Sequence, residues 1–387
     1  MMDAKSAARE HYNAAHQDLL ALSHRIHAHP EIGFEEEQAS TWLCESLDEA
    51  GFQVDRGICD LPTAFRAHAG SGPLHIAICA EYDSLPEIGH ACGHNIAASA
   101  VGAALAAAKV ADEVGLTISV IGTPAEEVGN AGGKILLLER GAFQGVHAAM
   151  MVHPAPIDIL RSKIIAASMF EVHYTGKESH ASAFPELGIN AADAITVAQT
   201  ALGLLRQHIR STDRIHGIVT CGGVAPNVVP GHTSATYIIR SETLDQLADL
   251  EPKVYRCFEA GGLATGAKVV ITGGDKPYAE MHHDGAMAEI YRANSAALGR
   301  QYPENSEWEI RPTGSTDMGN VSRAIPSIHP MIGINSLPAV NHQPEFTAHC
   351  VTEDADKAMI DGALTMAWTC IDMASNADLR KRLAEEA

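Results

Sequence analysis

Apolar residues in the first part of the chain follow two spacings that predict different elements. Helical spacing, with apolar residues three and four positions apart, predicts helices within 5–51, 95–113 and 131–140. Nearly continuous apolar runs predict strands at 64–69, 74–83, 116–127 and 147–154. Strands that alternate with helices are typical of a mostly parallel sheet with helices on both faces.

Near residue 164 the spacing changes. Residues 166–176 alternate like a half-exposed strand, and helical spacing follows at 189–209. The remaining predictions are two strands around a turn within 215–241, a helix at 243–262 that Pro252 breaks or restarts, and a strand at 267–274. The order β-α-β-β-α-β in about a hundred residues is that of a ferredoxin-like split βαβ unit.

The last part of the chain returns to helical spacing at 284–299 and ends in a long helix that begins near Glu353. We therefore expect an α/β domain made of residues 1–165 and 276–387, interrupted by an inserted α+β domain at 166–275. A chain of 387 residues exceeds the size at which one hydrophobic core usually stops growing, which agrees with two domains.

Charge and cysteine content exclude several classes of protein. The chain carries 48 acidic and 27 basic residues, a formal net charge of −21, whereas nucleic acid and anionic membrane surfaces need clustered lysine and arginine. The uncharged stretch from Asn95 is rich in small residues, so we expect a buried helix there and no membrane span. The eight cysteines are scattered and the first residues do not resemble a signal peptide, so a reduced, cytoplasmic protein is expected.

Metal-binding residue types follow the ends of successive predicted strands. They are Asp83, then Cys92 and His94 in the sequence IGHACGHN, then Glu126 and Glu127, then His153. Ligands collect at the carboxyl ends of strands in open α/β sheets, so these side chains are expected to converge. Thiolate, imidazole and carboxylate together suit zinc, and cobalt, nickel and manganese also fit the mixed donors. Taken alone, Cys92 would be an inert buried thiol and His94 a satisfied core histidine.

The doublet Glu126-Glu127 points to a cation most directly. Two adjacent carboxylates repel each other at a buried strand end unless a cation lies nearby. Because neighbouring side chains diverge, one can bind metal while the other takes the proton of a metal-bound water. The alternative is a solvated acidic loop, which the preceding apolar strand disfavours.

Seven motifs, in order along nearly the whole chain, carry a resemblance to a known family. They are EYDSLPEIGHACGHN (81–95), TPAEEVGNAGGK (123–134), VHP (152–154), GKESHAS (176–182), APNVVPG (225–231), STDMGNVS (315–322) and NHQPEFT (341–347). With them the chain resembles the aminoacylase/carboxypeptidase family of co-catalytic metallopeptidases and amidohydrolases. It is most similar to the branch with aminobenzoyl-glutamate hydrolases and N-acyl-amino-acid amidohydrolases.

The resemblance implies a role for each matching position. Two divalent ions per subunit (Zn, or Mn, Co or Ni) would be bridged by Cys92 and completed by His94, Glu127, His153 and His342. Glu126 would be the general base, and Asp83 would orient a ligand. In the inserted domain, which would act as a lid and join a homodimer, His180 would reach across the dimer to the oxyanion. Asn227 and Arg240 would hold the substrate carboxylate.

The function expected is a dinuclear amidohydrolase that cleaves N-acyl amino acids, or related small amides with a free carboxylate, by a metal-bound hydroxide. A dipeptidase or carboxypeptidase is the alternative, and a catalytically silent scaffold would require an essential residue to be missing. Many family members carry His where this chain has Glu81, which leaves the metal open.

Other histidines and one loop receive lesser roles. His90 is expected to be a structural neighbour of the ligands, and the cluster His24, His27 and His29 a helix-terminal packing motif. His282 and His283 are expected at the surface or at a strand end. Thr316 and Asp317 are expected to support the site.

Overall fold

The chain forms two compact units. The computed structural model describes residues 3–302 and 307–386. Unit 1 comprises Met1–Val128, Gly132–Lys163 and Met281–Ala387, and unit 2 comprises Gly129–Ala131 and Ile164–Glu280. The chain therefore enters unit 2 twice, first for three residues directly after the Glu126-Glu127 loop and then for the long insertion.

Unit 1 is built on a six-stranded sheet with the order β1-β2-β4-β3-β5-β13. These strands are β1 (Gln53–Arg56), β2 (Phe65–Ala69), β3 (Leu74–Ala80), β4 (Leu116–Gly122), β5 (Ala148–Met150) and β13 (Ser327–Ile328). β4, β3, β5 and β13 are parallel, whereas β2 runs antiparallel to β4 and to β1. The sheet is thus mostly parallel at its centre, as predicted.

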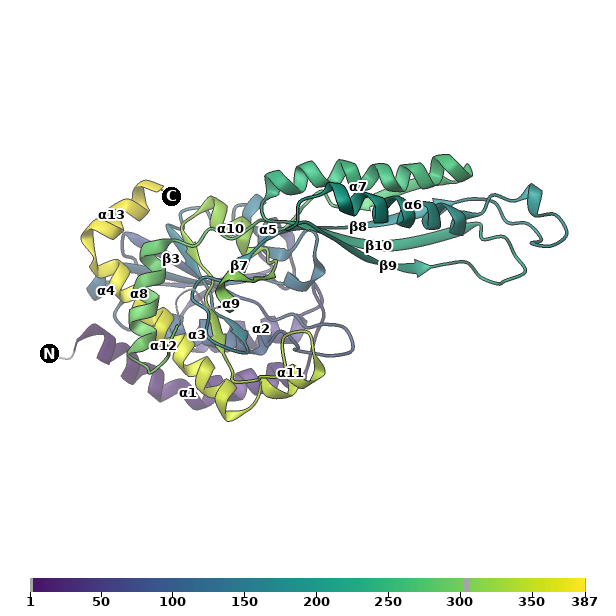
Figure 1. The fold of residues 1–387 in the computed structure, drawn as a ribbon. Helices are drawn as coiled ribbons and strands as arrows, with labels where there is room; N and C mark the ends of the chain where they lie inside the picture. The colour runs from purple at the N-terminus through teal and green to yellow at the C-terminus, as the bar shows by residue number, and fades with distance from the viewer. Residues whose placement is uncertain (1–2, 303–306, 387) are drawn as a thin grey trace. The chain divides into compact units, whose positions relative to one another are not determined.

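Helices cover both faces of this sheet (Figure 1). Successive side chains of a strand point to opposite faces. Accordingly Ile76 and Ile78 of β3 belong to the core formed with α1 (Ala4–Ala28), α3 (Ala98–Ala108) and α12 (Glu353–Ser375). Ala77 and Cys79 belong to a second core with α5 (Gly133–Glu139) and α10 (Met318–Ala324). This two-sided burial explains why the strands are continuous apolar runs.

The other elements of unit 1 are mostly short. The helices are α2 (Glu37–Glu49), α4 (Ala111–Val114), α8 (Gly285–Ala296), α9 (Glu307–Ile310), α11 (Pro344–His349) and α13 (Ala377–Glu386). Single 3-10 turns lie at Ile58–Asp60, His94–Ala97 (η2) and Glu126–Val128 (η3). The remaining strands are β6 (His153–Ala155), β7 (Lys163–Ile164, at the junction of the two units), β12 (Pro312–Gly314) and β14 (Met331–Gly333).

Two predicted elements of unit 1 are divided in the structure. The strand predicted at 147–154 is two strands, because β5 pairs with β3 and β13 whereas β6 pairs with β14. The helix predicted at 95–113 is η2, α3 and α4. α3 is buried along Ala98–Ala107, as expected for its small residues. Within the described parts of the chain, none of the helices has the length and apolar character needed to cross a membrane.

Unit 2 has the predicted β-α-β-β-α-β order. Its antiparallel sheet has the order β11-β8-β10-β9, with β8 (Ala166–Thr175), β9 (Arg214–Cys221), β10 (His232–Ser241) and β11 (Lys268–Gly273). α6 (Ala191–Leu205) and α7 (Leu244–Thr265) pack side by side on one face of this sheet (Figure 1). Short 3-10 turns lie at Pro185–Leu187 and Arg206–His208.

Pro252 does not break α7, contrary to the prediction. The helix runs without interruption from Leu244 to Thr265 with Pro252 inside it. A proline removes one helical hydrogen bond, and the burial of Leu250, Val254 and Phe258 against the sheet outweighs that loss.

Candidate functional site

The carboxyl ends of β3 and β4 lie level with each other. The two strands are parallel neighbours, and the backbone N–H of Thr123 donates to the carbonyl oxygen of Ala80 at 2.8 Å. The residues that follow each strand, Glu81 to Asp83 and Ala125 to Glu127, therefore meet at one edge of the sheet.

A tight turn brings Cys92 and His94 to the same edge. Gly93 between them has φ +76°, and a Cβ at this position would lie 2.8 Å from the Pro154 ring. Only glycine fits there, because both the left-handed backbone and the close approach exclude a side chain. The turn thus places η2 against β6, the strand that begins with His153.

The five predicted metal ligands come together in three overlapping groups in which the ligand atoms lie within 4.8 Å of one another. The groups are Cys92, His94 and His153; Cys92, Glu127 and His342; and His94, Glu126 and Glu127. Cys92, His94 and Glu127 each belong to two of these groups. His342 returns from far along the chain, and its backbone N–H donates to the carbonyl oxygen of Ala91 at 2.9 Å.

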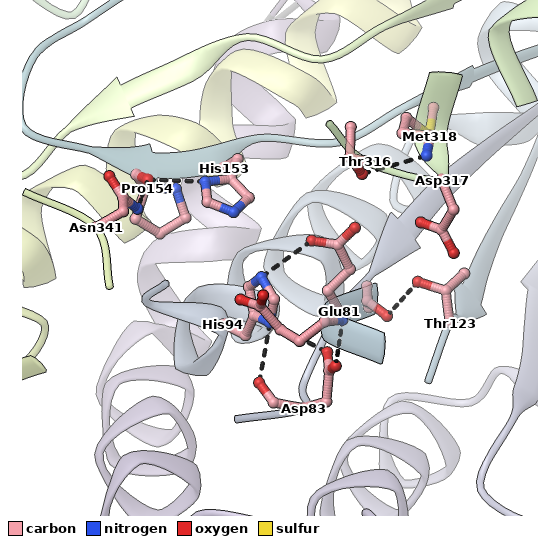
Figure 2. A network of polar contacts seen from close by, with 12 residues as sticks. Glu81, Asp83, His94, Thr123, His153, Pro154, Thr316, Asp317, Met318 and Asn341 are labelled. Atoms are coloured by element: carbon pink, nitrogen blue, oxygen red, sulfur yellow. Dashed lines mark hydrogen bonds and ion pairs between the residues drawn. The ribbon is translucent and has the colours of Figure 1, made fainter. Parts of the chain in front are cut away.

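His94, which is buried, and His153, which is half-buried, each have one imidazole nitrogen engaged by the protein (Figure 2). His94 Nδ1 donates to the backbone oxygen of Asp83 at 2.9 Å and lies 3.1 Å from Asp83 Oδ1. His153 Nδ1 donates to the carbonyl oxygen of Pro154 at 2.8 Å. Each imidazole therefore keeps the Nε2 lone pair for a ligand, and Asp83 fixes the ring of His94.

Several buried polar atoms at this edge have no hydrogen-bond partner among the described residues: His94 Nε2, Glu81 Oε2 and Glu127 Oε1. His94 Nε2 lies 3.3 Å from Glu81 Oε2. Burial and the charge of Glu127 raise the pKa of the Cys92 thiol well above its ordinary value. A thiol, an imidazole nitrogen and carboxylates gathered in one place are the donor set that a divalent cation satisfies, so these residues fit metal ions.

A buried lysine lies between two carboxylates beside this donor set. Lys134 Nζ, fully buried, contacts Glu81 Oε1 and lies 2.7 Å from Asp317 Oδ1. Its backbone N–H also donates to Asp317 Oδ2 at 2.8 Å. Although burial alone would raise it, Lys134 and His94 lower the pKa of Glu81 to about 2. The sequence predicted a supporting role for Asp317, whereas it gave no role to Glu81 or Lys134.

Glu126 lies close to this network. Its carboxylate is within 4.8 Å of those of Glu81 and Asp317, and only 8% of the residue is exposed. Burial, followed by the charges of Glu81 and Glu127, raises the pKa of Glu126 well above its ordinary value. A carboxylate in such a place holds a proton more readily than one in water, which suits proton transfer.

The three candidate residues of unit 2 fall into two places. His180 and Asn227 lie on neighbouring loops, because His180 forms a bridge with Val228 and the Ala181 N–H donates to the Asn227 carbonyl at 3.0 Å. Arg240 lies near the far end of β10, with Nε 3.4 Å from His216 Nε2. The stretch from His232 to Arg240 alone spans roughly 27 Å in an extended strand, so one copy of unit 2 keeps Asn227 and Arg240 apart.

The other histidines considered in the sequence lie outside the three groups of candidate metal ligands. His90 is buried and stacks on His27 with ring centroids 6.2 Å apart, while His27 Nε2 donates to the Thr347 carbonyl at 2.9 Å. His24 pairs with Asp356 at 2.7 Å. His283 Nε2 donates to the Ser162 carbonyl at 3.1 Å.

Replacing Asp83 with alanine is expected to weaken metal binding by about 10–100-fold, because His94 and the Glu127 backbone both lose the group that orients them. Competition with a chromogenic chelator measures this affinity. Asp55→Ala is a matched control, since the Asp55 side chain on β1 is 46% exposed and lies 3.8 Å from Arg66. Equal affinity in the wild type and Asp83→Ala would contradict the assignment.

Comparisons with known proteins show which family this chain resembles. A model of the peptidase dimerisation domain matches residues 166–264. A p-aminobenzoyl-glutamate hydrolase chain of Escherichia coli (strain K12) is 32% identical over 68% of this chain and 57% of its own. The crystal structure of a dinuclear metal-binding peptidase of the M20 family from Bacillus subtilis has a TM-score of 0.69 at 22% identity, covering 93% of this chain and 99% of its own.

A further relative covers nearly the full length. The Xaa-Arg dipeptidase of Mus musculus is 36% identical over 95% of this chain and 88% of its own. Its match and that of the dimerisation domain confirm the resemblance seen in the motifs. The chain therefore belongs to the M20 peptidase family of metal-dependent amide hydrolases, and it carries the family's dimerisation domain as an insertion.

Proposed function

We propose that this protein hydrolyses the amide bond of small substrates that end in a free carboxylate, either N-acyl amino acids or dipeptides. The observation that carries the proposal is the Glu126-Glu127 doublet, in which Glu127 joins Cys92 and His342 while Glu126 lies beside Glu81 and Asp317. The names of the relatives, a dipeptidase and an aminobenzoyl-glutamate hydrolase, support both substrate classes.

Cys92, His94, Glu127, His153 and His342 would hold two divalent ions, with Cys92 as the bridge. Zinc, manganese, cobalt and nickel all accept this mixture of sulfur, nitrogen and oxygen donors. When bound, such ions polarise the scissile carbonyl and activate water.

Glu126 would move the protons of the reaction. In this proposal its carboxylate takes a proton from the attacking water and then passes that proton to the leaving amine, so that the carboxyl returns to its starting state. Asp83 holds the His94 ring and, through its Oδ2, accepts the backbone N–H of Glu127 at 2.9 Å. It thereby fixes two groups of the site at once.

His180 would stabilise the developing oxyanion from the partner subunit of a homodimer. The backbone N–H groups of Ser182 and Ala183 donate to His180 Nδ1 at 3.3 and 3.2 Å, so Nε2 carries the proton and can donate outward. Asn227 lies beside His180, so we propose that both act in the partner's site and that Arg240 acts in a different site from theirs. The length of β10 between Asn227 and Arg240 is compatible with this division.

The edge strand β9 is the proposed dimer surface. It lies at one end of the unit 2 sheet, and its residues Ile218 and Val219 are 67% and 41% exposed. An exposed, apolar edge strand offers unpaired backbone groups to a second copy of the same strand. The match of residues 166–264 to a dimerisation domain supports this use.

A cytoplasmic location is also proposed. All eight cysteines are free, which is typical of proteins kept in a reducing compartment.

Mixing two inactive variants, Glu126→Gln and His180→Ala, is expected to restore activity. Random exchange of subunits makes half of the dimers mixed, and each mixed dimer has one complete site of two, so about a quarter of wild-type activity should return. Activity is measured after exchange is verified by mass spectrometry of differently labelled subunits. A mixture of each variant with itself is the control, and no recovery despite exchange would contradict action across the dimer.

The substrate class is tested by one panel. The metal-free protein is loaded in turn with Zn²⁺, Mn²⁺, Co²⁺ or Ni²⁺ and assayed with N-acetyl amino acids, aminobenzoyl-glutamate and dipeptides. Faster turnover of the acylated substrates supports an amidohydrolase, and faster turnover of dipeptides supports a dipeptidase. Metal binding without hydrolysis of any substrate would favour the catalytically silent scaffold.

A further inference from the structure

Glu36 is a fully buried glutamate in an otherwise exposed acidic run. It lies at the N-cap position of α2, yet its side chain makes no capping hydrogen bond. That task belongs to Glu31, whose carboxylate accepts the backbone N–H groups of Gln38 and Ala39 at 3.0 Å. The carboxylate of Glu36 is therefore not needed by its own helix.

Instead, Glu36 points at the loop that carries the proposed base. Its Oε1 accepts the backbone N–H of Ala125 at 2.7 Å, and its Oε2 accepts the Thr63 hydroxyl at 2.9 Å. Both of these hydrogen-bond partners are neutral, so they offset only part of the free-energy cost of burying a carboxylate. Burial and the charge of Asp83 raise the pKa of Glu36 to about 7. Packing alone does not explain a carboxylate that is buried in this way.

Ala125, the residue held, has an unfavourable backbone. Its φ is +59°, in the left-handed region that residues with a Cβ rarely adopt. The segment before α2 also packs against it, since a Cβ on Gly33 would lie 3.0 Å from both Cα and Cβ of Ala125. Such a conformation persists only when its surroundings enforce it, and Glu36 supplies the directional contact.

The backbone on each side of Glu126 is consequently held by a carboxylate. Glu36 binds the N–H of the residue before it, and Asp83 Oδ2 binds the N–H of the residue after it at 2.9 Å. The resemblance assigned a role to Asp83 alone. The second of these contacts comes from Glu36, which precedes Ala125 by about ninety residues in the chain.

We propose that Glu36 is a positioning residue of the hydrolytic reaction: by binding the Ala125 N–H it fixes the left-handed turn that orients the Glu126 carboxylate. This rests on the proposed role of Glu126 as the base. The side-chain hydrogen bonds of Glu36 join it to Ala125 and Thr63, which are not among the proposed metal ligands, so its loss should act on kcat and leave substrate binding and metal content in place.

Three variants of Glu36 test the proposal in the metal-loaded dimer. Glu36→Ala removes the acceptor, and kcat is expected to fall about 100-fold, as small misplacements of catalytic groups do, with KM and metal content unchanged. Glu36→Gln keeps a carbonyl oxygen for the Ala125 N–H and should retain most of the activity. Glu36→Asp, one methylene shorter, gives a second variant if Glu36→Ala does not fold, and its kcat should lie between the other two. The exposed neighbour Glu35 supplies the control Glu35→Ala.

Two further measurements separate positioning from a general structural role. Hydrogen exchange of the Ala125 amide should become faster in Glu36→Ala and stay slow in Glu36→Gln. In a Glu126→Gln background, Glu36→Ala should lower the residual kcat no further, because the group it positions is gone. Loss of metal, a change confined to KM, or a full additional loss in that background would overturn the proposal. If Glu126→Gln itself retained full turnover, the proposed function would fail, whereas an inactive Glu126→Gln beside a fully active Glu36→Ala would refute only the role of Glu36.

Discussion

Replacing Glu126 with glutamine is expected to lower kcat by about 10²–10⁴-fold while the protein keeps its metal ions. Glutamine preserves the size and the hydrogen-bonding oxygen of the side chain but cannot accept a proton from water at neutral pH. The residue is 8% exposed, so solvent has little access to replace it. Metal content by elemental analysis and steady-state kinetics on the best substrate of the panel measure the two quantities together.

Two companion variants make this result specific. Glu127→Gln removes a carboxylate from two of the three groups of proposed metal ligands, so it should lose metal as well as activity. Glu87→Gln changes an exposed glutamate in the loop before Cys92 and should behave as the wild type. Glu126→Gln with unchanged kcat would refute the proton-transfer role, and Glu126→Gln without metal would make Glu126 a ligand instead.

Local patterns predicted the framework of the site. The carboxyl ends of β3 and β4 could be located approximately, because burial on both faces of the sheet produces an uninterrupted apolar run that stops where the polar residues begin. The β-α-β-β-α-β order of unit 2 followed from the same kind of spacing. These are short-range signals, and they place Asp83 after β3 and Glu126 after β4 without any knowledge of tertiary contacts, whereas His153 is the first residue of β6.

Partners far apart along the chain could not be predicted in this way. Glu35, Glu36 and Glu37 are identical residues in one acidic run, and only packing selects the middle one for burial against Ala125. Lys134 likewise resembles any lysine at the start of an apolar helix, whereas its ammonium meets residues 53 positions before it and 183 after it. Such contacts depend on tertiary structure, which periodicity does not encode.

The resemblance to the family implied a role for each matching residue, but it did not indicate where these residues lie in the fold. It gave Asn227 and Arg240 one task, the substrate carboxylate, yet the extended strand between them separates them within a single subunit. The two proposed roles are compatible with an arrangement in which one residue comes from a second copy. The arrangement of unit 2 thus adds a reason for the proposed dimer that motifs alone could not provide.

Replacing Lys134 with methionine is expected to destabilise unit 1 by about 3–5 kcal/mol, since it leaves the carboxylates of Glu81 and Asp317 buried without their cation. Although burial alone would lower it, Asp317 and Glu81 raise the pKa of Lys134, so the stabilisation is fully present below the ordinary lysine pKa and therefore at neutral pH. Urea unfolding followed by tryptophan fluorescence measures it, because all three tryptophans (Trp42, Trp308 and Trp368) belong to unit 1.

The controls for this variant depend on where the charges lie. Lys381→Met removes an ammonium 3.8 Å from Glu385 at the surface, where both side chains are more than half exposed, and should change stability by less than about 1 kcal/mol. Adding Glu81→Gln and Asp317→Asn to Lys134→Met removes the charges of all three side chains, and most of the lost stability should return because neither of the two carboxylates is left without its cation. If Lys134→Met were as stable as the wild type, or if the triple variant were less stable than Lys134→Met, the cost would not arise from unpaired carboxylates, and the Lys134 ammonium would not be what stabilises them beside the metal-binding edge.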